Sequence, residues 1–177
     1  MQYTCRYSSP LGGILLAADD KGLTGLWFDG EKYFAKKLDP EHAEKRTPIL
    51  EAACRWLDDY FAGKNPAPFK PLHMIGTDFQ KAVWNILLTI PSGSTMTYGG
   101  IARMIAEKRG LRRMSAQAVG GAVGHNEISV IVPCHRVVGT DGSLTGYAGG
   151  IGRKAALLRL EHALTDRMYV PKKGTAL

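Results

Sequence analysis

The sequence lacks any long apolar run. Across its 177 residues, no stretch approaches the roughly 18 to 20 consecutive apolar side chains that cross a bilayer. Residues 1–7 also lack the apolar region of a secretory signal. These absences argue against a membrane partner and predict a cytoplasmic protein.

Cysteine is scarce as well. The three cysteines are Cys5, Cys54 and Cys134, and no two of them have the CxxC spacing. This usage argues against a disulfide framework and against a self-contained zinc site, so no metal is predicted. Cys5 and Cys54 are interpreted as packing residues, because a free cysteine usually behaves as a small buried hydrophobe.

Acidic residues are few in the second part of the chain. Residues 1–72 carry ten basic and ten acidic side chains, whereas residues 73–177 carry thirteen and six, which accounts for the net charge of +7. This asymmetry predicts a polyanion partner for the second part, although a solvated basic face would have the same composition. The partner is favoured by four basic residues within six positions: Lys108, Arg109, Arg112 and Arg113.

The order of elements predicts an α/β fold of the α+β type with two domains. Short apolar runs between turn residues in residues 1–30 are typical of a small antiparallel sheet. The apolar spacing over residues 47–61 predicts a helix. Three prolines within residues 64–71 mark a linker. The predicted domains are therefore residues 1–72 and 73–177.

The second domain is predicted to be mostly helical. Thr77 and Gln80 fit a capping box at the start of its first helix. Two further helices flank a basic loop at residues 108–114 and resemble a helix-turn-helix. A strand is expected over residues 129–132. The expected bounds of the later helices are 98–107, 116–123 and 153–164.

Cys134 stands between Pro133 and His135 in an otherwise apolar segment. A thiol attacks as the thiolate, and a cysteine with an ordinary pKa of about 8.5 is only a few per cent ionised near neutral pH. His135 could take the proton, and Arg136 could stabilise the negative sulfur. On these residues alone, catalysis and buried packing are equally good interpretations.

Several short motifs follow one another along the second part of the chain. They are Thr97-Tyr98-Gly99, Ala118-Val119-Gly120, Asn126, Pro133-Cys134-His135-Arg136-Val137, Gly146-Tyr147-Ala148-Gly149-Gly150 and Leu160-Glu161. Together they resemble the O6-alkylguanine-DNA alkyltransferase family, most strongly over residues 77–164. The resemblance implies a ribonuclease H-like N-terminal domain of sheet plus helix, and a C-terminal domain with a winged-helix-like helix-turn-helix.

The resemblance also implies a direct-reversal DNA repair protein. Members of this family flip an alkylated base out of double-stranded DNA. They then move the alkyl group from O6 of guanine, or O4 of thymine, onto their own cysteine, once per molecule and without a cofactor. Cys134 is the implied acceptor. The implied activity is that of a methylated-DNA–protein-cysteine S-methyltransferase, and the protein is expected to be a monomer.

The residues around Cys134 receive roles from the same resemblance. His135 would deprotonate Cys134 through a bridging water, and Glu161 would orient the imidazole. Asn126 would tie the helix-turn-helix to the cysteine segment, and Tyr98 would donate a proton to the guanine ring. The carbonyls of Cys134 and Val137 would read the exocyclic amine. The expected substrate and DNA contacts are Gln117, Ala118, Gly120, Arg136, Val137, Tyr147, Ala148 and Gly149, to which charge adds Arg112 and Arg113. The pair Lys172-Lys173 is consistent either with a DNA contact or with a disordered tail.

The chain departs from the family pattern in three places. Gln117 stands where an arginine commonly fills the gap left by the flipped base, and a glutamine has neither the charge nor the planar surface of a guanidinium. Glu127 replaces a common proline, and Ala148 replaces what is sometimes a serine. We expect weaker DNA affinity or slower repair, with the chemistry retained.

Two other functions compete with repair. One is a non-enzymatic DNA-binding protein, either a helix-turn-helix regulator or an alkyltransferase-like protein, but the latter lack the motif cysteine that is present here as Cys134. The other is a redox-sensing thiol, which often needs a resolving partner. Cys5 and Cys54 offer Cys134 no obvious partner nearby in sequence.

Overall fold

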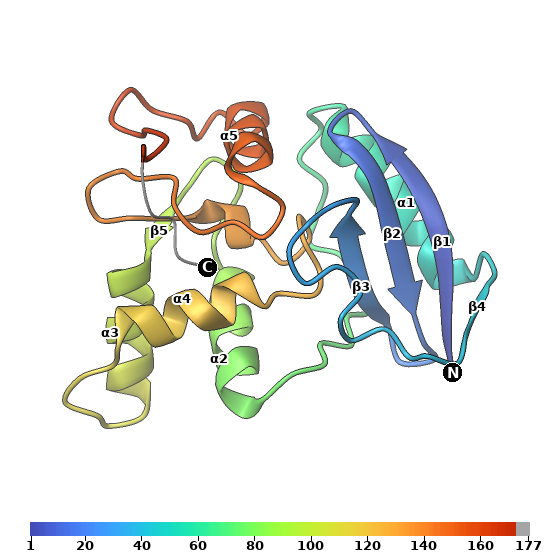
Figure 1. Cartoon of the computed structure of the whole chain (residues 1–177), viewed down its shortest axis with the longest axis horizontal. Helices are drawn as coiled ribbons and strands as arrows, with labels where there is room; N and C mark the ends of the chain where they lie inside the picture. Colours follow the sequence, from blue (N-terminus) through green and yellow to red (C-terminus); the bar gives the residue numbers. More distant parts are fainter. Residues whose placement is uncertain (173–177) are drawn as a thin grey trace. The chain divides into compact units, whose positions relative to one another are not determined.

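The computed structural model describes residues 1–172, which form two compact units (Figure 1). The N-terminal unit consists of Met1–Ile75 together with Glu127–Ile131. The C-terminal unit consists of Gly76–Asn126 and the residues from Val132 onward. Lys173, for which the sequence left a DNA contact and disorder open, lies outside the described residues.

The N-terminal unit contains a four-stranded sheet in the order β3-β2-β1-β4. Its strands are β1 (Gln2–Ser9), β2 (Gly12–Ala18), β3 (Leu23–Phe28) and β4 (His42–Glu44). The first three strands are antiparallel neighbours, as predicted. The fourth strand, which the sequence did not predict, runs parallel to β1. It is three exposed residues long, so it has no hydrophobic alternation to reveal it.

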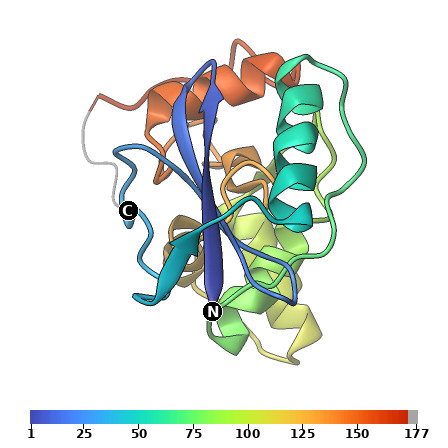
Figure 2. The ribbon, with the colours of Figure 1, turned by 90° about the vertical axis from the view of Figure 1, so that its right-hand side faces the viewer.

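One helix, α1 (Pro48–Phe61), accompanies this sheet. The Thr47 side chain accepts a hydrogen bond from the backbone of Leu50 and caps the helix N-terminus. Gly63 follows the helix with a φ of 79°, a conformation that suits glycine after a helix end. The buried side of α1 contacts β1 and β2, and Figure 2 shows the helix along one side of the sheet.

A segment from far along the chain completes the N-terminal unit at β3. The backbone N–H of Leu26 donates to the carbonyl of Glu127 at 2.8 Å, and the N–H of Ser129 donates to the carbonyl of Leu26 at 3.0 Å. The Trp27 indole donates to the Glu127 carboxylate at 2.9 Å. The buried carboxylate of Glu127 therefore has a hydrogen-bond donor in the Trp27 indole.

The strand predicted over residues 129–132 does not form. The N–H of Ile131 bonds to the carbonyl of Ser129 at 2.8 Å, which closes a tight turn. Val130 has a φ of 70°, a conformation that is unfavourable for a β-branched residue. The local hydrogen bond occupies backbone N–H and carbonyl groups that a strand would need for pairing with a neighbouring strand. The apolar pattern of these residues therefore reflects their burial and does not indicate a strand.

The C-terminal unit is mostly helical, as predicted. The helices start where capping was expected, with Thr77, Thr97 and Ser115 each accepting a bond from the backbone of the first turn, and Thr77 and Gln80 form the full capping box. Their bounds are α2 (Asp78–Leu87), α3 (Tyr98–Lys108), α4 (Ala116–Gly124) and α5 (Ile151–Leu160). The loop between α3 and α4 carries the basic cluster.

The last helix is shorter than the predicted 153–164. Residue Glu161 is its C-cap, and the next residue, His162, has a φ of 57°. The chain turns there and buries Ala163 against Val138, Leu144 and Leu158. No helix within residues 1–172 is long and apolar enough to cross a membrane.

Candidate active site

Cys134 begins a short 3-10 helix, η1 (Cys134–Arg136), which leads into β6 (Val137–Val138). Strand β6 pairs in parallel with β5 (Met96–Thr97), directly before α3. This pairing connects the cysteine segment, residues 132–138, to the start of α3, the first helix of the α3–α4 helix pair. The Cys134 side chain is buried, with 3% of the residue exposed.

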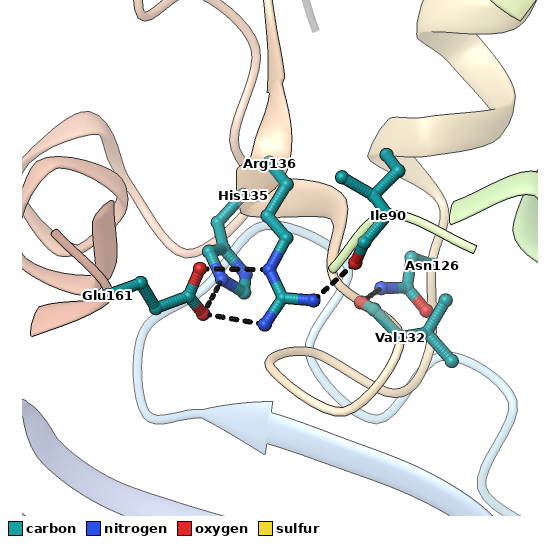
Figure 3. Close-up of polar contacts among 6 residues, drawn as sticks. All are labelled: Ile90, Asn126, Val132, His135, Arg136 and Glu161. Carbon is teal, nitrogen blue, oxygen red and sulfur yellow. Dashed lines mark hydrogen bonds and ion pairs between the residues drawn. The ribbon is translucent and has the colours of Figure 1, made fainter. Parts of the chain in front are cut away.

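Asn126 lies just beyond the end of α4 and reaches the cysteine segment (Figure 3). Its Nδ2 donates to the carbonyl of Val132 at 2.8 Å and to Sγ of Cys134 at 3.1 Å. An N–H that points at sulfur favours the thiolate over the thiol, because the negative form is the stronger acceptor. Both residues are buried, so this contact is made away from solvent.

His135 and Glu161 form a buried pair. The Nε2 atom of His135 lies 2.7 Å from Oε1 of Glu161, and the imidazole is fully buried. Burial alone would raise the pKa of Glu161, but bonds from His135 and Arg136 outweigh it and lower that pKa to about 2. Burial lowers the pKa of His135 more than Glu161 raises it. At neutral pH the pair is therefore a neutral imidazole and a carboxylate.

The tautomer of His135 follows from this charge state. An ionised carboxylate can only accept hydrogen bonds, so Nε2 carries the proton and donates it to Glu161. The remaining nitrogen, Nδ1, is then a lone-pair acceptor. Nδ1 is buried and has no hydrogen-bond partner among residues 1–172. It is available as a base.

The Arg136 guanidinium binds Glu161 and the backbone of Ile90. Its Nε and Nη2 atoms donate to the two carboxylate oxygens of Glu161 at 2.8 and 2.9 Å, and Nη1 donates to the carbonyl of Ile90 at 2.6 Å (Figure 3). The sequence suggested that this guanidinium could stabilise the sulfur or contact DNA. In the structure its donors hold Glu161, and through it they hold His135.

Tyr98, the first residue of α3, contacts the loop before α5. Its hydroxyl donates to the carbonyls of Thr145 at 3.0 Å and Gly146 at 3.2 Å. Burial, aided by negative charge on Cys134, raises the pKa of Tyr98, so the phenol stays protonated at neutral pH. The ring of Tyr147, further along this loop, makes a T-shaped contact with the ring of His135, with centroids 6.5 Å apart.

Lys154 is a site residue that sequence reasoning missed. It lies on α5 with no exposed surface, and its Nζ donates to the carbonyl of Val137 and, at 2.8 Å, to that of Thr145. Burial lowers its pKa to about 8, although negative charge on Cys134 acts in the opposite direction. A signal was present: Lys154 is seven residues before Glu161, which puts both on one helix face.

An open cavity of about 490 Å³ lies beside these residues, between α3, α4 and the loop before α5. Predicted contacts Tyr98, Gln117 and Gly120 line it, whereas Cys134 does not. Ala118, Arg112 and Arg113 are exposed on the helix pair and its loop, and Ala148 and Gly149 lie in the loop before α5. No cluster of three or more His, Cys, Asp or Glu within residues 1–172 could hold a metal ion.

Comparison with known proteins gives a consistent result. The ribonuclease-like domain of 6-O-methylguanine DNA methyltransferase matches residues 2–74, and its DNA-binding domain matches residues 78–163. The methylated-DNA–protein-cysteine methyltransferase of Methanosarcina acetivorans is 44% identical over 160 residues, covering 90% of this chain and 97% of that protein. The Mycobacterium tuberculosis protein of the same name is 44% identical over 153 residues, covering 86% of this chain and 88% of its own.

Solved structures agree with these matches. The O6-methylguanine methyltransferase of Mycobacterium tuberculosis has a TM-score of 0.76 and 42% identity, covering 92% of this chain and 94% of that one. The protein from the same organism in complex with DNA has a TM-score of 0.75 and 42% identity, covering 94% of each chain. The chain belongs to the 6-O-methylguanine DNA methyltransferase family. This confirms the resemblance and the predicted two-domain fold.

Proposed function

We propose that this chain repairs double-stranded DNA by moving the alkyl group from O6 of guanine to Sγ of Cys134, once per molecule. Membership of the family supports the reaction. The observation that carries it for this chain is the buried Cys134 thiol with an Asn126 donor at 3.1 Å, followed directly by the His135–Glu161 pair. O4-alkylthymine is a second substrate of the same chemistry.

Activation of the thiol begins at His135. Its Nδ1 lone pair takes the Cys134 proton, through a bridging water as the family resemblance implies, and the imidazole becomes positive. The Glu161 carboxylate stabilises that charge at 2.7 Å, while Arg136 keeps the carboxylate in place. On the sulfur side, the Asn126 amide and the Lys154 ammonium favour the negative charge.

Ionisation of the thiol supplies only part of the acceleration. Full ionisation raises the thiolate fraction about thirtyfold over a cysteine with a pKa of about 8.5 at pH 7, and a lower pKa also reduces nucleophilicity. Holding the sulfur in line with the alkyl carbon contributes more, since effective molarities reach ~10⁵ M in a site without water. The burial of Cys134 fits a site in which the nucleotide is flipped out of the duplex and brought to the sulfur.

In the transfer step the C–S bond forms as the C–O6 bond breaks, and negative charge develops on the guanine. Tyr98 is protonated and could donate to the ring, but its hydroxyl must first leave the Thr145 and Gly146 carbonyls. Base entry and proton donation are therefore coupled to this loop. The carbonyl of Val137 already accepts from Lys154 and keeps a second lone pair for the exocyclic amine.

The DNA-binding surface in this proposal is formed by α3, α4 and the loop between them. Gln117 and Gly120 line the cavity, and Ala118 is exposed beside them. Small side chains on α4 let its backbone approach a groove closely. The exposed Arg112 and Arg113 would contact phosphates, which fix position without reading sequence.

Intact-mass spectrometry tests the proposal directly. After incubation with a duplex that contains O6-methylguanine, the protein should gain one methyl group, and peptide mapping should place it on Cys134. The Cys134→Ala variant should bind the duplex and gain nothing. Binding without transfer by the wild type would instead favour a non-enzymatic recognition protein. A methyl group on another residue would contradict the assigned acceptor.

A further inference from the structure

Two cysteines far apart in sequence meet inside the N-terminal unit. Cys5 lies on β1 and Cys54 on α1, which packs against that strand. Their sulfur atoms are 4.0 Å apart although the residues are 49 positions apart, and both residues are buried, with 4% and 8% exposed. We propose that Cys5 and Cys54 are a reversible redox site that closes to an intramolecular disulfide in the presence of peroxide.

The geometry allows this bond with little rearrangement. A disulfide needs a sulfur separation of about 2.05 Å, so the two sulfurs must approach each other by about 2 Å. Rotation about the two Cα–Cβ bonds moves both sulfurs and can supply this approach. The burial of both thiols also restricts the partners available to either sulfur, because each is already in contact with the other.

The two thiols are unequal, which gives the reaction a direction. The contact with Cys5 lowers the pKa of Cys54 and outweighs burial, which raises it. The positive charge of Arg46 lowers it further, against the carboxylates of Asp58 and Glu51. The same contact with Cys54 and burial raise the pKa of Cys5. Cys54 therefore carries the thiolate and attacks first, whereas Cys5 keeps its proton and resolves.

Hydrogen peroxide is small enough to be the oxidant for a buried thiol. The Cys54 thiolate attacks one peroxide oxygen, the O–O bond breaks, and hydroxide leaves with its electron pair, so that Cys54 becomes a sulfenic acid. The Cys5 sulfur then attacks Cys54. The S–O bond breaks, and the leaving oxygen departs as water with the Cys5 proton. Two thiols are oxidised and one peroxide is reduced.

The bond would join β1 to α1 and close a long loop of chain. Such a cross-link stabilises mainly by restricting the unfolded chain, and the effect grows with loop length. We therefore expect the midpoint of thermal unfolding to rise by several degrees on oxidation. The rise should disappear when the disulfide is reduced with dithiothreitol.

The experiment uses the full-length Cys134→Ala variant, which retains only Cys5 and Cys54 as thiols. After a small molar excess of hydrogen peroxide, the intact mass should fall by two hydrogen atoms. Non-reducing peptide mapping should find Cys5 linked to Cys54, and dithiothreitol should restore both thiols. Because this variant has no acceptor cysteine, the result does not depend on the proposed alkyl transfer.

Matched controls are Cys5→Ser and Cys54→Ser in the same background. Each should form no internal link and show no rise in the unfolding midpoint on oxidation. The proposal fails if the Cys134→Ala protein gains oxygen without a link, forms a disulfide between two molecules, or keeps both thiols free. The decisive measurement is made on the Cys134→Ala protein itself, so the proposal can be tested even if one of the serine controls folds poorly.

Discussion

His135 donates from Nε2 to Glu161 at 2.7 Å, and this hydrogen bond determines that Nδ1 is the ring nitrogen with a free lone pair. A carboxylate whose pKa lies at about 2 is ionised at every pH at which DNA is intact, so it always selects the Nε2–H tautomer. The base at Nδ1 is thereby fixed by a residue 26 positions away along the chain.

The Glu161→Gln variant should transfer methyl groups about 10²-fold or more slowly than the wild type. The amide of glutamine can donate to Nε2 and stabilise the wrong tautomer, and it cannot balance the imidazolium charge. Single-turnover rates on O6-methylguanine DNA measure this effect, with the exposed Glu51→Gln as control. Equal rates for Glu161→Gln and the wild type would show that Glu161 neither selects the His135 tautomer nor stabilises the imidazolium.

The pH dependence of the wild-type rate has a predicted sign. Burial holds the pKa of His135 below its ordinary value of 6.5, so the neutral base persists as the pH falls to that value. The acid decline in the transfer rate should therefore have its midpoint below pH 6.5. A decline centred at or above pH 6.5 would contradict the buried, neutral state of the imidazole.

Glu161 should also make the protein sensitive to acid. Its pKa is lowered from 4.5 to about 2, which corresponds to about 3 kcal/mol of stability. A carboxylate with a lowered pKa contributes above its ordinary pKa, and the contribution is lost as the pH falls through 4.5 towards 2. Urea unfolding should show the wild type losing its advantage over Glu161→Gln across this window. A constant difference would argue against it.

Much of the fold was accessible from the sequence because its signals are local. Thr47, Thr77, Thr97 and Ser115 each cap a helix that was predicted to start there. The strand expected over residues 129–132 was wrong for the opposite reason. Its apolar pattern reflects burial beside β3, and the turn at those residues depends on contacts with a part of the chain about a hundred residues earlier.

The site was accessible only in part. The motifs pointed to Cys134, His135 and Glu161, but the direction of Arg136 depends on where α5 ends relative to η1, which no local pattern encodes. Lys154 was missed because lysine is almost never fully buried, so its place on the apolar face of a helix was not taken as a sign of function.

Asn126 offers a test of sulfur activation that is separate from the base. The Asn126→Leu variant removes the donor to Cys134, and we expect the transfer rate to fall about ten- to a hundredfold. Asn126→Asp places a carboxylate against the sulfur and should be slower still, although its shape is nearly unchanged. DNA affinity measured in parallel separates chemistry from binding. An aspartate variant as fast as the wild type would rule out this role.

Lys154→Met should slow transfer about tenfold, since it removes a buried positive charge near the thiolate and a link between Val137 and Thr145. Because the pKa of Lys154 is about 8, the wild type should also lose rate as the pH rises past that value, whereas Lys154→Met should not show this decline. Arg159→Met, an exposed change on the same helix, serves as control. Identical alkaline profiles for wild type and Lys154→Met would contradict the electrostatic part of this role.

Gln117 lines the cavity at the start of α4 and carries no charge. The Gln117→Arg variant should bind duplex DNA more tightly and repair faster. The logarithmic salt dependence of its affinity should steepen by about one unit if the guanidinium adds a phosphate contact. Gln117→Lys adds the same charge without a planar surface, so a gain by arginine alone would identify stacking as the cause. If Gln117→Arg neither binds more tightly nor repairs faster, then the missing charge at this position limits neither DNA affinity nor the repair rate.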